Sequence, residues 1–299
     1  MLRAAKGTEV REQAAIARIF TAAVFHEMVK KGQSPIFARL VKDLSVEVDK
    51  YTWSVGQILD ELFSVLKRKS FRNEYAYKAA VAQKVLLGSH SLRTASLVDE
   101  FRVGKNKADI VMLNGTSTAY EIKSDRDRLD RLYSQVISYS EVFAGVTVLC
   151  AERHLESVVS IVPDFVGVSV LTDRYQISKF RKGFSDPSRT VSSSIFKAIT
   201  QREAVEILKN LDVCIPNLPN TQMHSALDRE FVKIPSAVVH DEMVRVLKKT
   251  RNLSGLSESV KSLPVSLRFF ALTVPLTERT KENLLCAIDT PLMEALKWG

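Results

Sequence analysis

Long apolar runs are scarce in this sequence of 299 residues. Runs such as 146–151 fall far short of the roughly 20 residues that a membrane-spanning helix needs, so we expect no membrane partner. The start of the chain carries positive charge, but no apolar stretch follows before Glu9, which argues against a secretory signal. We therefore expect a cytoplasmic protein.

Cysteine, glycine and paired histidines are also sparse. The three cysteines lie more than 60 residues apart, which fits neither a disulfide framework nor a thiolate metal site. The 11 glycines form no phosphate-binding loop and no dinucleotide fingerprint, which excludes a nucleotide-driven motor. The histidines form no pair at i and i+4, so a zinc-protease helix is absent. No Gly-x-Ser-x-Gly elbow occurs, although one sequence leaves a serine triad open.

Positive charge exceeds negative charge, with 43 lysines and arginines against 34 acidic residues and a net charge of +9. Such a balance favours an anionic partner, and nucleic acid is the commonest one for a basic soluble protein. The excess is spread along the chain, so charge alone is equally compatible with an ordinary solvated surface.

The hydrophobic pattern divides the chain into three zones, 1–70, 71–182 and 183–299. In the first zone the pattern over 9–31 predicts one amphipathic helix. Ser34 followed by proline, and Ser54 with a glutamine three residues on, predict two further helix starts. Helices in a basic segment of this size would form a DNA-reading helix-turn-helix or a small helical cap.

The middle zone predicts an α/β core. A helix is expected at 73–87, a strand at 95–103 and then a hairpin, because Asn114 followed by glycine is a strong turn signal. The other expected elements are strands at 108–113 and 118–123, a helix capped by Ser124 and Asp127, a buried strand at 146–150 and a peripheral hairpin of 166–171 with 174–180. The third zone is mainly helical, with helices expected at 195–211, 241–249 and 281–298.

The hairpin carries the residues that indicate chemistry. Asp109 begins one strand, and Glu121 and Lys123 share a face near the end of its partner. Two carboxylates at one point suit Mg²⁺ or Mn²⁺, and a lysine beside them could orient water or offset charge on a phosphoryl group. The alternative is an exposed strand with alternating charges. Asp109 faces the same side as Glu121 only if the two are paired, which requires a three-residue loop or a bulge.

The order of these motifs resembles the PD-(D/E)XK phosphodiesterase superfamily. The resemblance covers roughly 73–151, and it is closest to a poorly characterised bacterial nuclease-like family. It implies a restriction-endonuclease-like core of helix, three-stranded antiparallel meander, helix and strand, with helical regions on both sides. The motifs that carry it are Asn73-Glu74-Tyr75, Glu100-Phe101-Arg102, Ala108-Asp109 and Tyr120-Glu121-Ile122-Lys123.

The resemblance also implies roles for individual residues. Asp109, Glu121 and Ile122 would hold Mg²⁺ or Mn²⁺, Lys123 would serve the attacking water, and Glu74 would complete the site from the preceding helix. Ala108 stands where many members have proline, at a position that varies widely. Glu74 has a second interpretation, because a carboxylate at a helix start is favoured by the helix dipole regardless of catalysis.

A polar stripe is expected on the helix after the hairpin. Arg128, Arg131, Gln135 and Tyr139 follow one another at i+3 or i+4, opposite the leucines. The ordinary interpretation is a solvated face. By the resemblance, Gln135 and Tyr139 would contact the scissile phosphate or the lysine, and the arginines would contact the nucleic-acid backbone. Two further candidates for backbone contacts are Lys69 and Arg72.

The sequence thus predicts a Mg²⁺-dependent phosphodiesterase that cleaves nucleic acid, DNA rather than RNA, in bacterial genome defence or mobile-element biology. Whether it acts as an endonuclease or an exonuclease is left open, as is a homodimer. One alternative is a catalytically inactive nucleic-acid-binding protein with the same fold. Another is a regulator built on the N-terminal helices. Salt-dependent binding without metal-dependent cleavage would favour either alternative.

Overall fold

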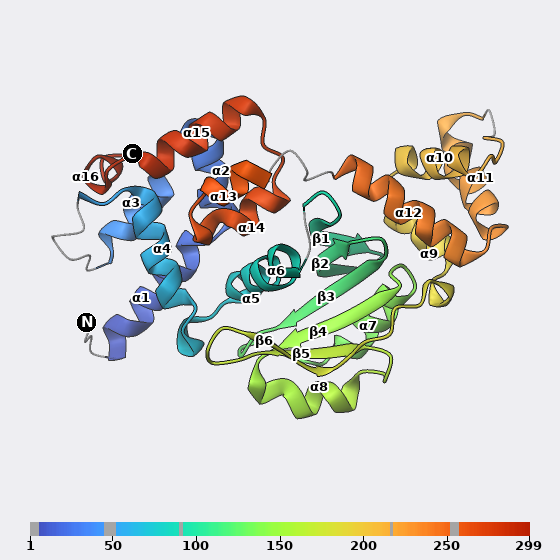
Figure 1. Ribbon diagram of the computed structural model, residues 1–299, viewed down its shortest axis with the longest axis horizontal. Helices are drawn as coiled ribbons and strands as arrows, with labels where there is room; N and C mark the ends of the chain where they lie inside the picture. Colours follow the sequence, from blue (N-terminus) through green and yellow to red (C-terminus); the bar gives the residue numbers. More distant parts are fainter. Residues whose placement is uncertain (1–5, 45–51, 90–91, 216–217, 252–256) are drawn as a thin grey trace. The chain divides into compact units, whose positions relative to one another are not determined.

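The computed structural model describes residues 6–44, 52–89, 92–215, 218–251 and 257–299. The chain folds into two compact units (Figure 1). One unit combines 1–83 with 256–299, and the other is formed by 84–255. These units divide the chain differently from the three sequence zones, because the last segment belongs with the N-terminal helices.

The first unit is helical. Its central contacts are aromatic: the ring of Tyr75 stacks on Phe20 and on Phe270 at centroid distances of 5.5 and 4.6 Å. Asn283 ties the two ends of the chain together, because its Nδ2 donates to the carbonyl oxygens of Val29 and Lys30 at 3.1 Å. The helices are α1 (Lys6–Ile19), α2 (Ala22–Lys31), α3 (Pro35–Lys42), α4 (Val55–Leu66), α5 (Glu74–Ala80), α13 (Ser257–Ser262), α14 (Arg268–Thr273), α15 (Glu278–Asp289) and α16 (Leu292–Ala295).

Two predicted helix starts in this unit are confirmed. Ser34 caps α3 by accepting a hydrogen bond from the Phe37 amide, and Ser54 forms a capping box with Gln57 at the start of α4. The single helix predicted over 9–31 is wrong. It is split into α1 and α2 because the backbone of Thr21 is extended, with φ −122° and ψ 156°.

The helix predicted at 73–87 is present but irregular. Asn73 caps α5, a π-helical segment η3 (Val81–Leu86) follows, and α6 (Leu87–Ser89) continues beyond it. A π-helical stretch of this kind is a local widening of the helix and is uncommon.

The second unit contains a six-stranded mixed sheet whose spatial order follows the chain order from β1 to β6. β3, β4 and β5 are mutually parallel, and the remaining neighbours are antiparallel. The strands are β1 (Ser96–Val103), β2 (Asn106–Leu113), β3 (Ser117–Lys123), β4 (Gly145–Cys150), β5 (Gly167–Leu171) and β6 (Ile177–Arg181). The predicted strands, the peripheral hairpin and the order of helix, three strands, helix and strand are confirmed.

Helices cover this sheet (Figure 1). α7 packs on β2 and β4, and α8 packs on β4 and β5. α9 contacts β1, and α12 contacts β2. A single hydrophobic core joins the strands to these helices. The helices that follow β3 along the chain in this unit are α7 (Leu132–Ser140), α8 (Leu155–Ile161), α9 (Ser192–Ala198), α10 (Gln201–Asn210), α11 (Asn220–Val232) and α12 (Ser236–Thr250).

Several helix boundaries differ from prediction. The helix predicted at 195–211 is two helices, because Thr200 interrupts it and caps α10 through a capping box with Glu203. The one predicted at 281–298 is also two, because the backbone is extended at Thr290 and proline follows. The break expected from residues 216–219 lies partly outside the described residues. Within the described ranges, no helix is both long and apolar enough to cross a membrane.

Candidate functional site

The register of the β2–β3 hairpin positions the candidate residues. Leu113 pairs with Ser117, and the ladder continues to Ile110 with Tyr120. Three residues therefore form the turn, in which Gly115 has a φ of 95° and the Asn114 amide donates to the carbonyl of Thr116. The predicted three-residue loop is confirmed. Continuing this register places Asp109 opposite Glu121, on the same face of the sheet.

The ladder between β2 and β3 stops at this point, although β2 keeps pairing with β1 as far as Asn106. In place of a backbone bond, Oδ2 of Asp109 accepts a hydrogen bond of 2.6 Å from the amide of Ile122. Because the amide and carbonyl of one residue leave a strand on the same side, the Ile122 carbonyl also faces toward β2. The Asp109 carboxylate thus lies where the two strands separate.

Glu121, Lys123 and Gln135 form a buried polar cluster. The Nζ of Lys123 lies 2.7 Å from Oε1 of Glu121 and 3.0 Å from Oε1 of Gln135. Glu121 is only 2% exposed, and the other two are 8% exposed. Burying an ion pair costs desolvation energy that the attraction between the two charges often does not offset. The pair is therefore weak evidence of a stabilising role. The alternative interpretation, an exposed strand with alternating charges, is wrong for Glu121 and Lys123.

Tyr139 completes the cluster from α7. Its hydroxyl lies 2.9 Å from Oε2 of Glu121 and 2.9 Å from the carbonyl of Lys107. A phenol has one proton to donate, so the two acceptors compete for it. Burial, followed by the negative charge of Glu121, raises the pKa of Tyr139 well above its usual range. The charge of Asp109 acts in the same direction, which shows that both carboxylates bear on this hydroxyl.

The polar stripe predicted across Arg128, Arg131, Gln135 and Tyr139 is wrong as a surface feature. α7 begins only at Leu132, so Arg128 precedes the helix and Arg131 is its N-cap. The expected cap at Ser124 forms a turn instead: the Asp127 carboxylate accepts from the Ser124 amide and hydroxyl at 2.7 and 2.6 Å. Gln135 and Tyr139 then lie on the buried face of α7, together with Leu132 and Val136.

A cleft of about 500 Å³ adjoins the cluster. It shares Lys123 and Gln135 with the cluster and is otherwise lined by Arg126, Asp127, Arg128, Asp130 and Arg131. Four cationic side chains face two carboxylates, so the cleft favours an anion. Sequence reasoning singled out two of its arginines and missed Arg126, although three arginines within six residues could have suggested a shared surface.

The other sequence-predicted residues belong to the first unit. Glu74 belongs to the first unit, and its exposed carboxylate pairs with Lys78 at 2.9 Å. Its predicted contribution to the site stays a prediction. Lys69 is exposed in the same unit, whereas Arg72 is buried and its Nε donates to the carbonyl of Lys67 at 2.8 Å. Arg72 therefore has a partner within the protein, and its predicted contact with a nucleic-acid backbone stays a prediction.

Glu100 of β1 forms an ion pair with Lys107 of β2, with 2.6 Å between Oε2 and Nζ. The backbone of Glu100 has a φ of 55°, a value that residues with a Cβ atom rarely adopt. That local twist interrupts the β1–β2 ladder opposite Asp109, beside the candidate site.

The donor set suits a hard divalent cation. Asp109, Glu121 and the Ile122 carbonyl all offer oxygen, and Mg²⁺ is commonly held by one or two carboxylates while it keeps several waters. Within the described residues, no three or more His, Cys, Asp or Glu side chains cluster to form a metal site. A cation here would thus depend on two carboxylates. If it took Oε2 of Glu121, the Tyr139 hydroxyl would keep the Lys107 carbonyl as its acceptor.

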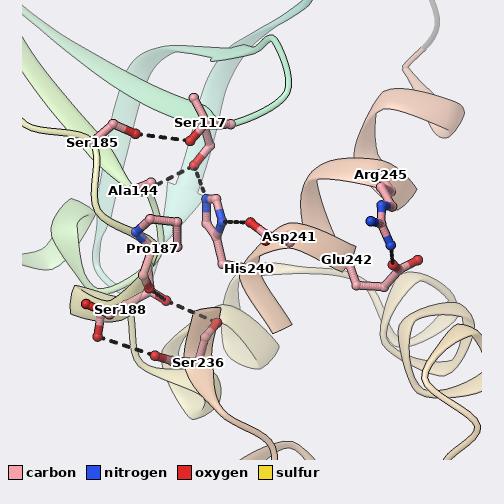
Figure 2. A network of polar contacts seen from close by, with 12 residues as sticks. Ser117, Ala144, Ser185, Pro187, Ser188, Ser236, His240, Asp241, Glu242 and Arg245 are labelled. Atoms are coloured by element: carbon pink, nitrogen blue, oxygen red, sulfur yellow. Dashed lines mark hydrogen bonds and ion pairs between the residues drawn. The ribbon is translucent and has the colours of Figure 1, made fainter. Parts of the chain in front are cut away.

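A second polar network lies in the same unit (Figure 2). His240 of α12 places Nε2 2.7 Å from the hydroxyl of Ser117, and its Nδ1 lies 3.0 Å from Oδ1 of Asp241. Ser117 also accepts a hydrogen bond from the Ala144 amide. The arrangement has the residue types of a serine triad, but Ser117 and His240 are fully buried and neither lines the cleft. It joins α12 to the sheet.

Comparisons with known proteins place this chain in a family. A model of the family of bacteriophage P4 protein cII matches residues 67–262. The chain belongs to the cII family. Among curated proteins, protein cII of Enterobacteria phage P4 is 37% identical over 79 residues, which make up 26% of this chain and 30% of that protein. The match to this relative thus spans less than a third of its length. No solved structure gives a significant match.

The family match covers the whole region that concerns the site. It includes the sheet unit and extends into the first unit at both ends, over 67–83 and 256–262. Asp109, Glu121 and Lys123 all fall inside it, as do Glu74 and the arginines of the cleft.

Proposed function

We propose that this cII-family protein is a metal-dependent nuclease that hydrolyses phosphodiester bonds, with DNA as the preferred substrate. One observation carries the proposal: Asp109, Glu121 and Lys123 gather where β2 and β3 separate, beside a cleft rich in arginine. The element order resembles the PD-(D/E)XK core, in which the same residue types occupy the end of the hairpin. A restriction-endonuclease-like core is part of this proposal.

We assign each residue a role that is consistent with its contacts. Asp109, Glu121 and the Ile122 carbonyl would hold Mg²⁺ or Mn²⁺, which when bound supplies positive charge and lowers the pKa of coordinated water. Lys123 lines the cleft, and its ammonium group would offset the charge that develops on phosphorus oxygens. Gln135 fixes that ammonium, and Tyr139 fixes Glu121.

The arginines of the cleft would hold the substrate backbone. Guanidinium groups bind phosphate through paired hydrogen bonds, and these contacts position a nucleic acid without reading its sequence. The family name comes from a phage protein, which accords with a setting in mobile-element biology; genome defence is the other setting we propose to test.

The second candidate function is binding without catalysis. One observation favours it: both carboxylate oxygens of Glu121 already have partners within the protein, Lys123 and Tyr139. A cluster that served only to hold α7 against the sheet would look the same. In that case the cleft would still attract nucleic acid, and added metal would change nothing.

A substrate panel separates the two functions. Purified full-length protein is incubated with linear, nicked, branched and single-stranded DNA and with RNA, in Mg²⁺, Mn²⁺ or chelator. We expect cleavage that requires metal and that is lost in Asp109→Asn, which keeps the side-chain shape. Salt-dependent binding with no cleavage of any substrate in either metal would favour the second function.

A further inference from the structure

The cleft is lined by four cationic side chains and two carboxylates, which gives it a net positive charge. Both of its carboxylates are already engaged, since Asp127 accepts from Ser124 and Asp130 lies 2.8 Å from Nε of Arg128. In the described part of the chain, neither Arg126 nor Arg131 forms an ion pair. These two guanidinium groups are therefore available to an external anion, and Lys123, which is paired with Glu121, lines the cleft beside them.

The loop that carries the arginines is held in place at several points. Its first turn is closed by the Ser124–Asp127 hydrogen bonds and by the Asp127 amide, which donates to the Ser124 carbonyl at 3.1 Å. Leu129 packs against the core, and its carbonyl accepts from the amide of the buried Leu132 at 2.9 Å. A loop fixed in this way loses less conformational entropy when its arginines bind a ligand.

The position of the loop adds a further favourable charge. Arg131 is the N-cap of α7, a helix of nine residues, and no side chain caps it. The positive end of the helix dipole thus lies beside the arginines and favours an anion. The cleft volume of about 500 Å³ lies within the range of small-ligand sites, roughly 300–1,000 Å³, so it has room for a nucleotide phosphate and its sugar.

We propose that the cleft formed by Arg126, Arg131 and their neighbours binds a second phosphate of the same strand, adjacent to the phosphate that faces Lys123. This inference rests on the proposed function, because it assigns the substrate of the same site. The site would then take a polynucleotide strand through two successive phosphates. An isolated phosphodiester or a nucleoside monophosphate would fill only half of it.

Competition tests the number of phosphates that bind. A short fluorescein-labelled single-stranded oligodeoxynucleotide is bound to the wild-type protein in chelator, and its anisotropy is followed. The competitors are thymidine 3′,5′-bisphosphate and thymidine 5′-monophosphate. A second charge-assisted phosphate contact should make the bisphosphate the stronger competitor by about tenfold or more. This advantage should disappear in the double variant Arg126→Ala with Arg131→Ala.

A matched variant controls for general charge. Arg202 of α10 and Arg229 of α11 are exposed arginines outside the cleft lining. Their replacement by alanine removes the same two charges and should leave the bisphosphate advantage intact. The cleft variant should also lower the salt slope of oligonucleotide binding by about 0.7 for each phosphate that is no longer bound, since that is the slope for single strands.

The outcomes distinguish this inference from the proposed function. Equal competition by the two nucleotides, or equal effects of the two double variants, would overturn the second phosphate site while leaving metal-dependent cleavage untouched. A wild-type protein that bound no oligonucleotide at all would overturn both proposals. All of the replaced arginines are exposed, so the variants should fold, which circular dichroism checks.

Discussion

Lys123 and Glu121 lie two residues apart on β3 and form a buried ion pair, with 2.7 Å between Nζ and Oε1. Because both charges are withdrawn from water, removing one partner leaves the other uncompensated. We expect Lys123→Ala to lower the free energy of unfolding by about 3 kcal/mol or more. Urea denaturation followed by circular dichroism measures this change.

The double variant Lys123→Met with Glu121→Gln is the control for that prediction. It removes both charges while keeping similar side-chain volumes, so we expect it to be more stable than Lys123→Ala. A double variant as unstable as the single one would show that the charges do not depend on each other.

Tyr139 should matter for both stability and cleavage. Tyr139→Phe keeps the buried ring but removes the hydroxyl that bonds Glu121 and the Lys107 carbonyl. We expect a loss of about 1 kcal/mol in the free energy of unfolding, typical of one hydrogen bond, and a lower cleavage rate at saturating substrate. Because burial raises the pKa of Tyr139, the pH profile of cleavage between pH 6 and 9 should show no titration of this phenol. A profile that changes shape when the hydroxyl is removed would contradict this.

We predict that the free energy of unfolding depends on pH through His240. Burial lowers the pKa of His240 below its ordinary value, and the hydrogen bond and charge of Asp241 offset this only in part (Figure 2). The unfolded chain therefore binds a proton more readily than the folded one. The stabilisation is complete above the ordinary histidine pKa of about 6.5 and is lost as the pH falls from there through the folded pKa.

Melting temperatures between pH 5 and 8 test this dependence. We expect the wild-type protein to lose more stability on acidification than His240→Asn, since asparagine does not titrate. Parallel pH curves for the two proteins would show that this histidine does not titrate differently in the folded state.

Lys69 and Arg72 should differ, although both were expected to contact nucleic acid. Arg72 is buried and bonded to the Lys67 carbonyl, so Arg72→Ala should lower stability by about 1 kcal/mol or more. Lys69 is exposed, so Lys69→Ala should leave stability unchanged and should lower the salt slope only if this segment contacts the backbone. An unchanged unfolding free energy in Arg72→Ala would contradict the structural role.

Much of the hairpin could be predicted from sequence because its determinants are local. The alternation of side chains and the turn at Asn114 together fix the pairing of neighbouring strands. The start of α7 could not be predicted in the same way. Ser124 and Asp127 have the spacing of a helix cap, yet the carboxylate accepts from the serine and closes a turn. The break at Thr200 did have a local signal, the capping box with Glu203.

Some side chains contact residues that are distant in the sequence, and the hydrophobic pattern could not predict where these side chains lie. Tyr139 lies on the buried face of α7 because its hydroxyl reaches Lys107, which is 32 residues away along the chain. Ser117 and His240 meet across 123 residues. A polar residue at a core-facing position looks like a surface residue until its partner is known. The arrangement of the helices around the sheet also depends on contacts between residues distant in the sequence, so it could not be predicted from the pattern.

The most direct test of the proposed nuclease site is the single-turnover rate of DNA cleavage with Mg²⁺ or Mn²⁺ in Lys123→Met and Asp109→Asn. Asp109→Asn removes a charged metal ligand and Lys123→Met removes the cation that offsets phosphoryl charge, each worth about 3 kcal/mol at the transition state, so each rate should fall by at least about 10²-fold. Binding of DNA in chelator should fall far less than the cleavage rate does. Cleavage by Lys123→Met at the wild-type rate would contradict the assignment of this site.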